Sequence, residues 1–172
     1  IKGVPGRIKI NLHRALQDNP KFVGATIKRG PKGWEVSLQV KVAAVPVTFA
    51  AVSPIGIDMG LTHLATLSTG ETIANPRHAK DAAAELRCAQ RKLARAKRGS
   101  NRRQKVRAAV IRCHAKIANS RQTYLHQVSK DLVRRFDMIA LEYLNVSDMA
   151  KHPMLAKAIH DASWSTLKFM LS

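Results

Sequence analysis

The chain has 172 residues, enough for one domain with a hydrophobic core, or for one domain and part of another. Its apolar content of 45% is ordinary for a globular protein, but its formal net charge of +19 is not. Because such an excess of charge repels itself in a compact chain, it favours nucleic acid as the partner. No apolar stretch approaches the ~20 residues of a membrane span, which argues against a membrane partner. The two cysteines, Cys88 and Cys113, do not form a C-x-x-C pair, so we expect no thiolate zinc site here and a reducing compartment.

Residues 1–50 are expected to form β structure. Residues 7–13 alternate between polar and apolar side chains, which is the period of a half-buried strand. Residues 22–29 and 34–42 predict two further strands, and the Gly-Pro-Lys-Gly sequence at 30–33 predicts the turn between them. We expect these three antiparallel strands to belong to a larger barrel or sheet.

Residues 43–54, which contain two prolines, indicate a boundary before a second β group. Residues 55–58 are too apolar for a strand with one exposed face, so we expect them at the centre of a sheet. Residues 63–67 and 71–74 flank a Ser-Thr-Gly turn and predict a hairpin.

Residues 77–136 show apolar side chains at helical spacing, interrupted at 99–101. The pattern predicts a helical hairpin that leads into a helix, which in turn feeds a strand at 138–142. That strand is apolar throughout and follows a helix, so we expect it to be buried and parallel to its neighbour. The sequence Asp-Ala-Ser at 161–163 predicts an N-cap for a helix that starts at Trp164.

Two apolar runs end in a carboxylate, the first at Asp58 and the second at Glu142. Acids are scarce in this chain, eleven against thirty Lys and Arg, so their position needs a reason. Ligand sites in open α/β sheets lie at the carboxyl ends of strands, and carboxylate oxygens suit Mg²⁺ or Mn²⁺. Two such ions about 3.5–4 Å apart support phosphodiester cleavage. Gly60 would allow a close approach of the backbone beside this site.

Two other interpretations of the carboxylates stay open at this point. Both could be strand-terminal acids that cap a nearby helix or face solvent. An actin-like ATPase fold also begins with an apolar strand followed by Asp, one residue and Gly. That fold needs a second glycine-rich phosphate loop and a far longer chain, and the sequence contains neither.

The predicted helical segment carries charge of a single sign. No Asp or Glu occurs from residue 86 to residue 121, and a mixed-sign solvated face is the usual alternative. A single-sign face on two helices indicates phosphate binding that depends on shape and salt. The candidate nucleic-acid-binding residues are Arg87, Arg91, Lys92, Arg95, Lys97, Arg98, Arg102, Arg103, Lys105, Arg107, Arg112, Lys116 and Arg121.

Several motifs, in order along the chain, resemble the TnpB/OrfB transposon-encoded proteins. The sequences at 56–61 and 64–70 resemble the first RuvC motif of that family, and the sequence at 141–146 is similar to the second. The similarity continues through 74–76, the basic segment, 116–121 and 125–126, and it ends with 158–164. Together the motifs cover nearly the whole chain.

The family resemblance implies an α/β fold with an RNase H-like (RuvC) core and a helical-hairpin insertion. Residues 1–50 would be the C-terminal strands of a wedge-type β-barrel domain. Residues 54–172 would be an incomplete RuvC-like nuclease domain, with 77–136 as its basic helical segment. The chain begins without methionine, and we expect it to be a fragment.

The resemblance also implies the site and its cofactor. Asp58 would be the first catalytic carboxylate, bridging two Mg²⁺ (or Mn²⁺) ions, and Glu142 the second, holding one. The family's third acid and a four-cysteine Zn²⁺ element would lie in later motifs, and neither Asp148 nor Asp161 matches the third acid. We therefore expect residues 1–172 to be inactive alone.

By the same resemblance, the parent protein would be an RNA-guided, metal-dependent DNA endonuclease of transposon origin. Its partners would be a guide RNA and target DNA, with no membrane or small-molecule substrate, in a prokaryotic cytoplasm near the nucleoid. The basic helices would contact the guide RNA–DNA duplex or the guide scaffold. The alternatives are a nuclease-dead guided repressor and a non-catalytic nucleic-acid-binding module.

Overall fold

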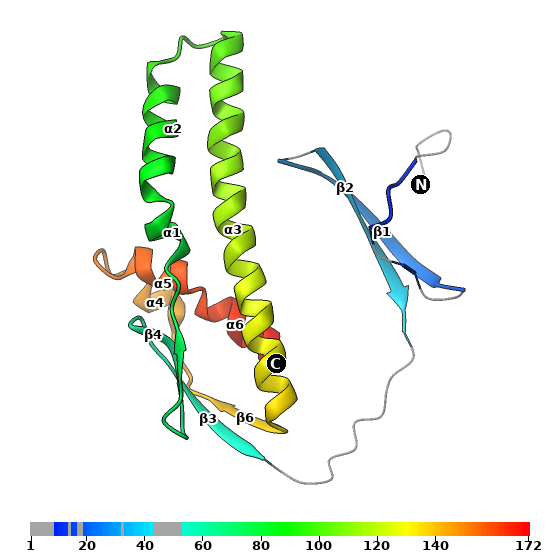
Figure 1. Ribbon diagram of the computed structural model, residues 1–172, viewed down its shortest axis with the longest axis vertical. Helices are drawn as coiled ribbons and strands as arrows, with labels where there is room; N and C mark the ends of the chain where they lie inside the picture. The colour runs from blue at the N-terminus through cyan, green and yellow to red at the C-terminus, as the bar shows by residue number, and fades with distance from the viewer. Residues whose placement is uncertain (1–8, 14, 17–18, 32, 43–52) are drawn as a thin grey trace. The chain divides into compact units, whose positions relative to one another are not determined.

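A computed structural model describes residues 9–13, 15–16, 19–31, 33–42 and 53–172 of the chain (Figure 1). The chain divides into two structural units, Ile1–Val47 and Thr48–Ser172. Residues 43–52 of the predicted boundary lie outside the described residues. So do residues 7 and 8 of the strand predicted at 7–13.

The first unit contains an antiparallel hairpin. Strands β1 (Lys21–Gly30) and β2 (Gly33–Lys41) pair along their length, and Gly30 lies opposite Gly33 at the turn. Gly33 has a φ of 140°, a conformation that side chains rarely adopt, which explains the glycine at the start of β2. The strands predicted at 22–29 and 34–42 are therefore confirmed.

The third predicted strand, at 7–13, is wrong over its described part. Residues 9–13 form no strand. Alternation of polar and apolar side chains gives a segment one apolar face, but a strand also needs a neighbour for its backbone hydrogen bonds. Among the described residues of this unit, β1 and β2 pair only with each other, in a two-stranded sheet.

The second unit contains a four-stranded sheet in the order β5-β4-β3-β6. Its strands are β3 (Pro54–Met59), β4 (His63–Leu67), β5 (Thr72–Ala74) and β6 (Met138–Leu141). β3, β4 and β5 form an antiparallel meander, whereas β6 runs parallel to β3. The predicted central position of 55–58 and the predicted parallel strand at 138–142 are both confirmed.

Helices cover one face of this sheet (Figure 1). Ile55, Ile57 and Met59 of β3 are buried against Leu125 and Leu132, which belong to the long helix α3 (Asn101–Arg135). Burying each of these side chains stabilises the fold by roughly 1.5–3 kcal/mol relative to exposure. Helices α5 (Ala156–Ala162) and α6 (Trp164–Leu171) complete this core.

The opposite face of the sheet is exposed in the described part of the chain, so the expectation that β6 is buried was wrong. β6 is the edge strand, and 56% of the surface of Met138 is exposed. Ile139 and Leu141 of β6 are only half-buried, on the side of the core. An apolar composition therefore predicted the strand but not the cover on its second face.

The remaining helices are α1 (His78–Asp81), α2 (Ala83–Arg95) and α4 (Val146–Met149). α2 and α3 form the predicted helical hairpin, with the interruption at the predicted place. The helix expected to follow the hairpin is not separate, because α3 continues for 35 residues from the hairpin connection to the start of β6. None of the described helices is both long enough and apolar enough to span a bilayer.

The helix predicted to start at Trp164 is confirmed, with Ser163 at its N-cap position, but the side-chain cap expected from 161–163 is absent. Ser163 precedes α6 with a φ of 54°, and its side chain accepts no capping hydrogen bond. The Asp161 carboxylate instead accepts hydrogen bonds from the backbone N–H of Ala79 in α1 and from Arg121 in α3. The tertiary partners of Asp161 thus replace the local cap.

An ion pair joins the end of α3 to the β4–β5 turn. The two guanidinium N–H groups of Arg135 donate to the two carboxylate oxygens of Glu71, and Arg135 Nη1 also donates to Asp131 at 3.1 Å. The hydrogen bonds from Arg135 to Glu71, together with the positive charge of Arg135, hold the pKa of Glu71 below its usual value of 4.5.

A lowered pKa of Glu71 in the folded state makes this contact sensitive to acid. Its contribution is complete above pH 4.5 and is lost as the pH falls through the lowered pKa of the folded state. We expect Glu71→Gln to lower the Tm slightly at pH 7 and to have a smaller effect at pH 2.5. Thermal melting followed by circular dichroism measures both values. An equal effect of Glu71→Gln at the two pH values would contradict this reading.

Candidate carboxylate site and basic helical hairpin

Asp58 and Glu142 lie beside each other on neighbouring strands. Ile57 of β3 is the register partner of Leu141 of β6, so the next residue of each strand continues the pairing. The backbone N–H of Glu142 donates to the carbonyl of Ile57 at 3.4 Å, which extends the ladder past the end of β6. Because neighbouring strands are about 4.8 Å apart, the two carboxylates belong to one small region of the sheet.

Both carboxylates lie on the uncovered face of the sheet, where they are exposed. Alternation along β3 directs Ile57 and Met59 into the core, and Gly56 and Asp58 to the other side. Side chains and backbone of β3, β4 and β6 line a shallow concavity here that includes Asp58, Thr66 and Glu142. At its floor the N–H of Gly56 donates to Ser68 Oγ at 3.1 Å.

This donor set suits a hard divalent cation. Two carboxylates on adjacent strands provide oxygen ligands of the type that Mg²⁺ and Mn²⁺ prefer. Within the residues that the structure describes, no group of three or more His, Cys, Asp or Glu side chains comes together. Asp58 and Glu142 are therefore two candidate ligands, and both are exposed to solvent.

The turn after Asp58 is fixed by contacts from distant segments. The buried indole of Trp164 donates to the carbonyl of Gly60 at 3.3 Å, and Asn75 Nδ2 donates to the carbonyl of Leu61 at 2.9 Å. A Cβ on Gly60 would lie 3.1 Å from the carbonyl oxygen of His63. The expected close backbone approach at Gly60 is thus present, and it is made by the next strand.

Asp148 does not join the two carboxylates. It lies in α4, where its side chain pairs with Lys151 at 2.6 Å and its backbone N–H is capped by Asn145. Asp161 is also engaged elsewhere, with Arg121 and Ala79. The structure therefore assigns both acids to local or tertiary stabilisation.

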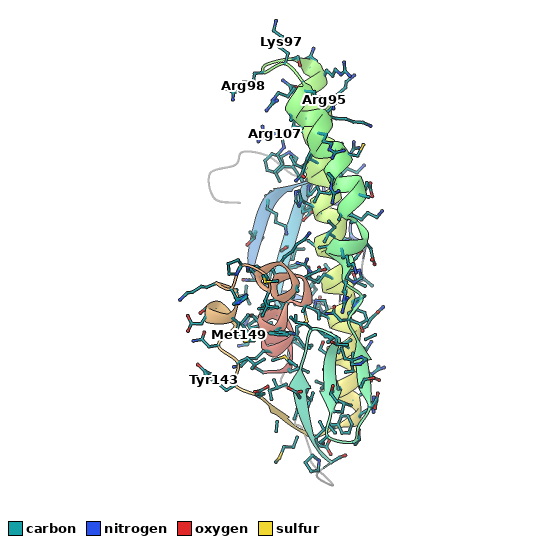
Figure 2. All side chains as sticks on the ribbon, turned by 90° about the vertical axis from the view of Figure 1, so that its left-hand side faces the viewer. Arg95, Lys97, Arg98, Arg107, Tyr143 and Met149 are labelled. Atoms are coloured by element: carbon teal, nitrogen blue, oxygen red, sulfur yellow. The ribbon has the colours of Figure 1, made fainter. Side chains whose placement is uncertain are left out.

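The basic segment forms the hairpin of α2 and α3, and eleven of the thirteen candidate cations are exposed on it. Arg95, Lys97 and Arg98 lie at the end of the hairpin most distant from the sheet (Figure 2). Near that end, Lys92, Arg95 and Arg102 line one groove. The sequence has no carboxylate between 86 and 121, and Glu85 in the first turn of α2 offsets only Lys116.

Three of the thirteen candidates make contacts within the protein: Arg103, Arg121 and the exposed Lys116, which pairs with Glu85 of α2 at 3.7 Å. Arg103 Nη1 donates to the carbonyls of Leu93 and Ala96 at 2.8 and 3.0 Å, and so satisfies the free carbonyls at the end of α2. Arg121 forms the ion pair with Asp161, and the two side chains are 26% and 9% exposed. Arg103 and Arg121 shape the hairpin and its attachment, and the exposed cations are better placed to contact a partner.

Sequence reasoning missed the residues that position this site. Asn75, Trp164 and Asp161 each form a contact with a segment far away in the sequence. Asn75 and Trp164 lie in segments that resemble the TnpB/OrfB family, and this was the only signal for them. Nothing in the sequence near Asp161 indicates that its partners are Ala79 and Arg121.

Comparisons with known proteins show the family of the chain. Residues 37–152, more than half of the chain, match the OrfB_IS605 family, which is described as "Probable transposase". Two curated proteins whose names begin "Putative RNA-guided DNA endonuclease" are also similar. One, from Streptomyces pristinaespiralis, is 41% identical over 95% of this chain and 41% of its own length. The other, InsQ of Escherichia coli K12, is 32% identical over 73% of this chain and 31% of its own length.

The chain thus spans about two fifths or less of the length of these curated relatives. The matched region includes both carboxylates, the whole basic hairpin and the whole four-stranded sheet. On these grounds, the chain is a TnpB-like protein and belongs to the OrfB_IS605 family.

Proposed function

We propose that the chain is the nuclease-core portion of an RNA-guided, metal-dependent DNA endonuclease of transposon origin. The observation that carries this proposal is the adjacency of Asp58 and Glu142 on the exposed face of the sheet. Two acids 84 positions apart meet there in a chain that has few acids. The names of the two curated relatives support the same activity and the same RNA and DNA partners.

The sheet topology supports an RNase H-like (RuvC) core as the finer fold. An antiparallel meander of three strands is followed, after a long helix, by a strand parallel to the first. The site is at the carboxyl ends of the two parallel strands, where open α/β sheets bind their ligands. The β1–β2 hairpin of the first unit is compatible with a wedge-type β domain.

The pair Asp58 and Glu142 would hold Mg²⁺ or Mn²⁺. A bound divalent cation supplies Lewis-acid stabilisation of the phosphate and lowers the pKa of water to make a nucleophile. The contribution of this chain is to fix two anionic side chains on a rigid sheet. The hydrogen bonds from Trp164 and Asn75 keep the turn after Asp58 in one conformation.

The exposed cations of the α2–α3 hairpin would bind the phosphate backbone of the nucleic acid. The hairpin offers charge of one sign and few aromatic side chains, which favours backbone contacts over base stacking. Affinity should then depend strongly on salt, since each neutralised phosphate releases counterions.

Removing two cations from the hairpin groove tests this surface. We expect Arg95→Gln with Arg102→Gln to reduce the slope of log K against log salt for duplex binding by about 2, because each phosphate contact contributes about 0.9. The matched control is Lys130→Gln with Arg134→Gln, which removes two exposed cations from the sheet end of α3. Fluorescence anisotropy with a labelled duplex measures both slopes. Equal slopes for the two variants would argue against the hairpin as the binding surface.

A nuclease-dead guided binder is the second candidate function. The basic hairpin supports it, because its cations act on phosphates without the carboxylates. The two candidates differ in one measurement on the full-length protein with its guide RNA. A nuclease cuts target DNA in Mg²⁺ and stops when the cation is chelated, whereas a guided binder retains the DNA and leaves it intact.

A further inference from the structure

A second basic site lies at the carboxyl end of β3, outside the hairpin. The segment 75–80, which leads into and forms α1, and the segment 154–161, which includes α5, enclose a cavity of about 370 Å³. This volume is within the ~300–1,000 Å³ range of ligand pockets. Three cations line it: Arg77, Lys80 and Lys157.

The charge of this cavity is available to a ligand. Neither Lys80 nor Lys157 forms a salt bridge with a carboxylate in the described part of the chain, and the single side-chain contact recorded there for Arg77 is a 3.4 Å hydrogen bond to the carbonyl of Leu61. The one acid that lines the cavity, Asp161, is already neutralised by Arg121 at 2.9 Å. The cavity therefore carries a positive charge without a counterion among the residues that the structure describes.

The other part of the cavity lining is apolar. Leu61 and Ala158 belong to it, and so does Met154, whose side chain is exposed over 85% of its surface. An exposed methionine beside three cations offers a surface for a sugar or a base next to a place for a phosphate. A nucleotide unit combines these two properties, whereas inorganic phosphate uses only the first.

The cavity is close to the carboxylates along the chain. Leu61 lines the cavity and is three residues after Asp58, so their Cα atoms are at most about 11 Å apart. Hydrogen bonds from Asn75 and Arg77 to the Leu61 carbonyl connect the cavity to the turn that follows Asp58. A strand bound in this cavity would therefore be held within a few nucleotides of the carboxylate site.

We propose that this cavity, lined by Arg77, Lys80 and Lys157, binds one phosphate and its nucleoside in a single-stranded nucleic acid. The inference rests on the proposed function, which supplies the nucleic acid. It adds a second contact that is independent of the α2–α3 hairpin and positions the strand beside Asp58 and Glu142.

The test is binding of a labelled ten-nucleotide deoxythymidine strand to the 172-residue chain, measured by fluorescence anisotropy over a range of salt. The pocket variant is Lys80→Gln with Lys157→Gln, both of them exposed residues, so that folding is preserved. We expect roughly tenfold weaker binding and a salt slope reduced by about 1.4, since each single-strand phosphate contact contributes about 0.7. The control, Lys130→Gln with Arg134→Gln, should match the unmodified chain.

The outcomes separate the pocket from the proposed function. If the pocket variant binds like the control while Arg95→Gln with Arg102→Gln binds weakly, the pocket inference is wrong and the proposed function stands. If all of these variants bind like the unmodified chain, the nucleic-acid part of the proposed function fails as well. Deoxythymidine monophosphate serves as a competitor, and competition as strong as that of the ten-nucleotide strand would show a free-nucleotide site instead.

Discussion

Replacing Asp58 by asparagine in the full-length protein should reduce guide-dependent DNA cleavage in Mg²⁺ by about a hundredfold or more. Asparagine has nearly the same volume, so the sheet is kept, but the charge that would hold a divalent cation beside Glu142 is lost. In the proposed mechanism such a cation would supply about 3 kcal/mol or more of transition-state stabilisation, and each 1.36 kcal/mol is a factor of ten in rate. Single-turnover cleavage of labelled target DNA is the appropriate measurement.

The controls for this prediction are other carboxylate variants of the same full-length protein. Asp148→Asn removes an exposed carboxylate that pairs with Lys151, and we expect it to cut at the rate of the parent. Glu142→Gln should reproduce the loss seen for Asp58, and the double variant should lose little more, because the two residues would serve one site. Target binding should survive in all of them. Cleavage by Asp58→Asn at the parent's rate would show that the carboxylate site is assigned wrongly.

Removing the carboxylate of Asp161 should have the largest effect on stability. Its side chain is 9% exposed, pairs with Arg121 and accepts the backbone N–H of Ala79, so it connects α5 to α3 and α1. Asp161→Ala leaves a largely buried guanidinium without its partner, which typically costs about 3 kcal/mol. For a chain of this size the Tm should fall by about 6–12 °C.

An exposed ion pair provides the comparison for Asp161. Asp148→Ala breaks the Asp148–Lys151 pair, whose side chains are 57% and 77% exposed, and should cost about 1 kcal/mol or less. Arg121→Met combined with Asp161→Leu removes both buried charges and should be less destabilising than Asp161→Ala alone. Urea unfolding followed by circular dichroism gives these differences. If Asp161→Ala lowers the free energy of unfolding no more than Asp148→Ala does, the Asp161–Arg121 ion pair stabilises the fold no more than an exposed pair.

Apolar patterning predicted the strands that form the site, because their signals are local. The run at 55–58 ends in Asp58 and the run at 138–142 ends in Glu142, and each forms a strand of the sheet. The parallel pairing followed from the intervening helix, since a connection of this length can return a strand in the same direction. Apolar side chains at helical spacing likewise predicted the hairpin of α2 and α3.

Contacts between distant segments could not be predicted in the same way. The residues 9–13 alternate like a strand but form none, since a strand depends on a neighbour that alternation does not specify. Arg121 and Arg103 look like the other cations of the basic segment, and only their tertiary partners set them apart. The pocket of Arg77, Lys80 and Lys157 joins segments almost eighty positions apart, so no window of sequence contains it.

The continuity of α3 has a mechanical consequence. From Arg121 onward the helix is clamped by the Asp161 ion pair and the core, whereas residues 101–120 extend about 30 Å beyond that clamp. At its other end α3 passes into β6, the strand that leads to Glu142. Because α3 is one continuous helix, the basic end of the hairpin and the strand that leads to Glu142 are joined through a single element.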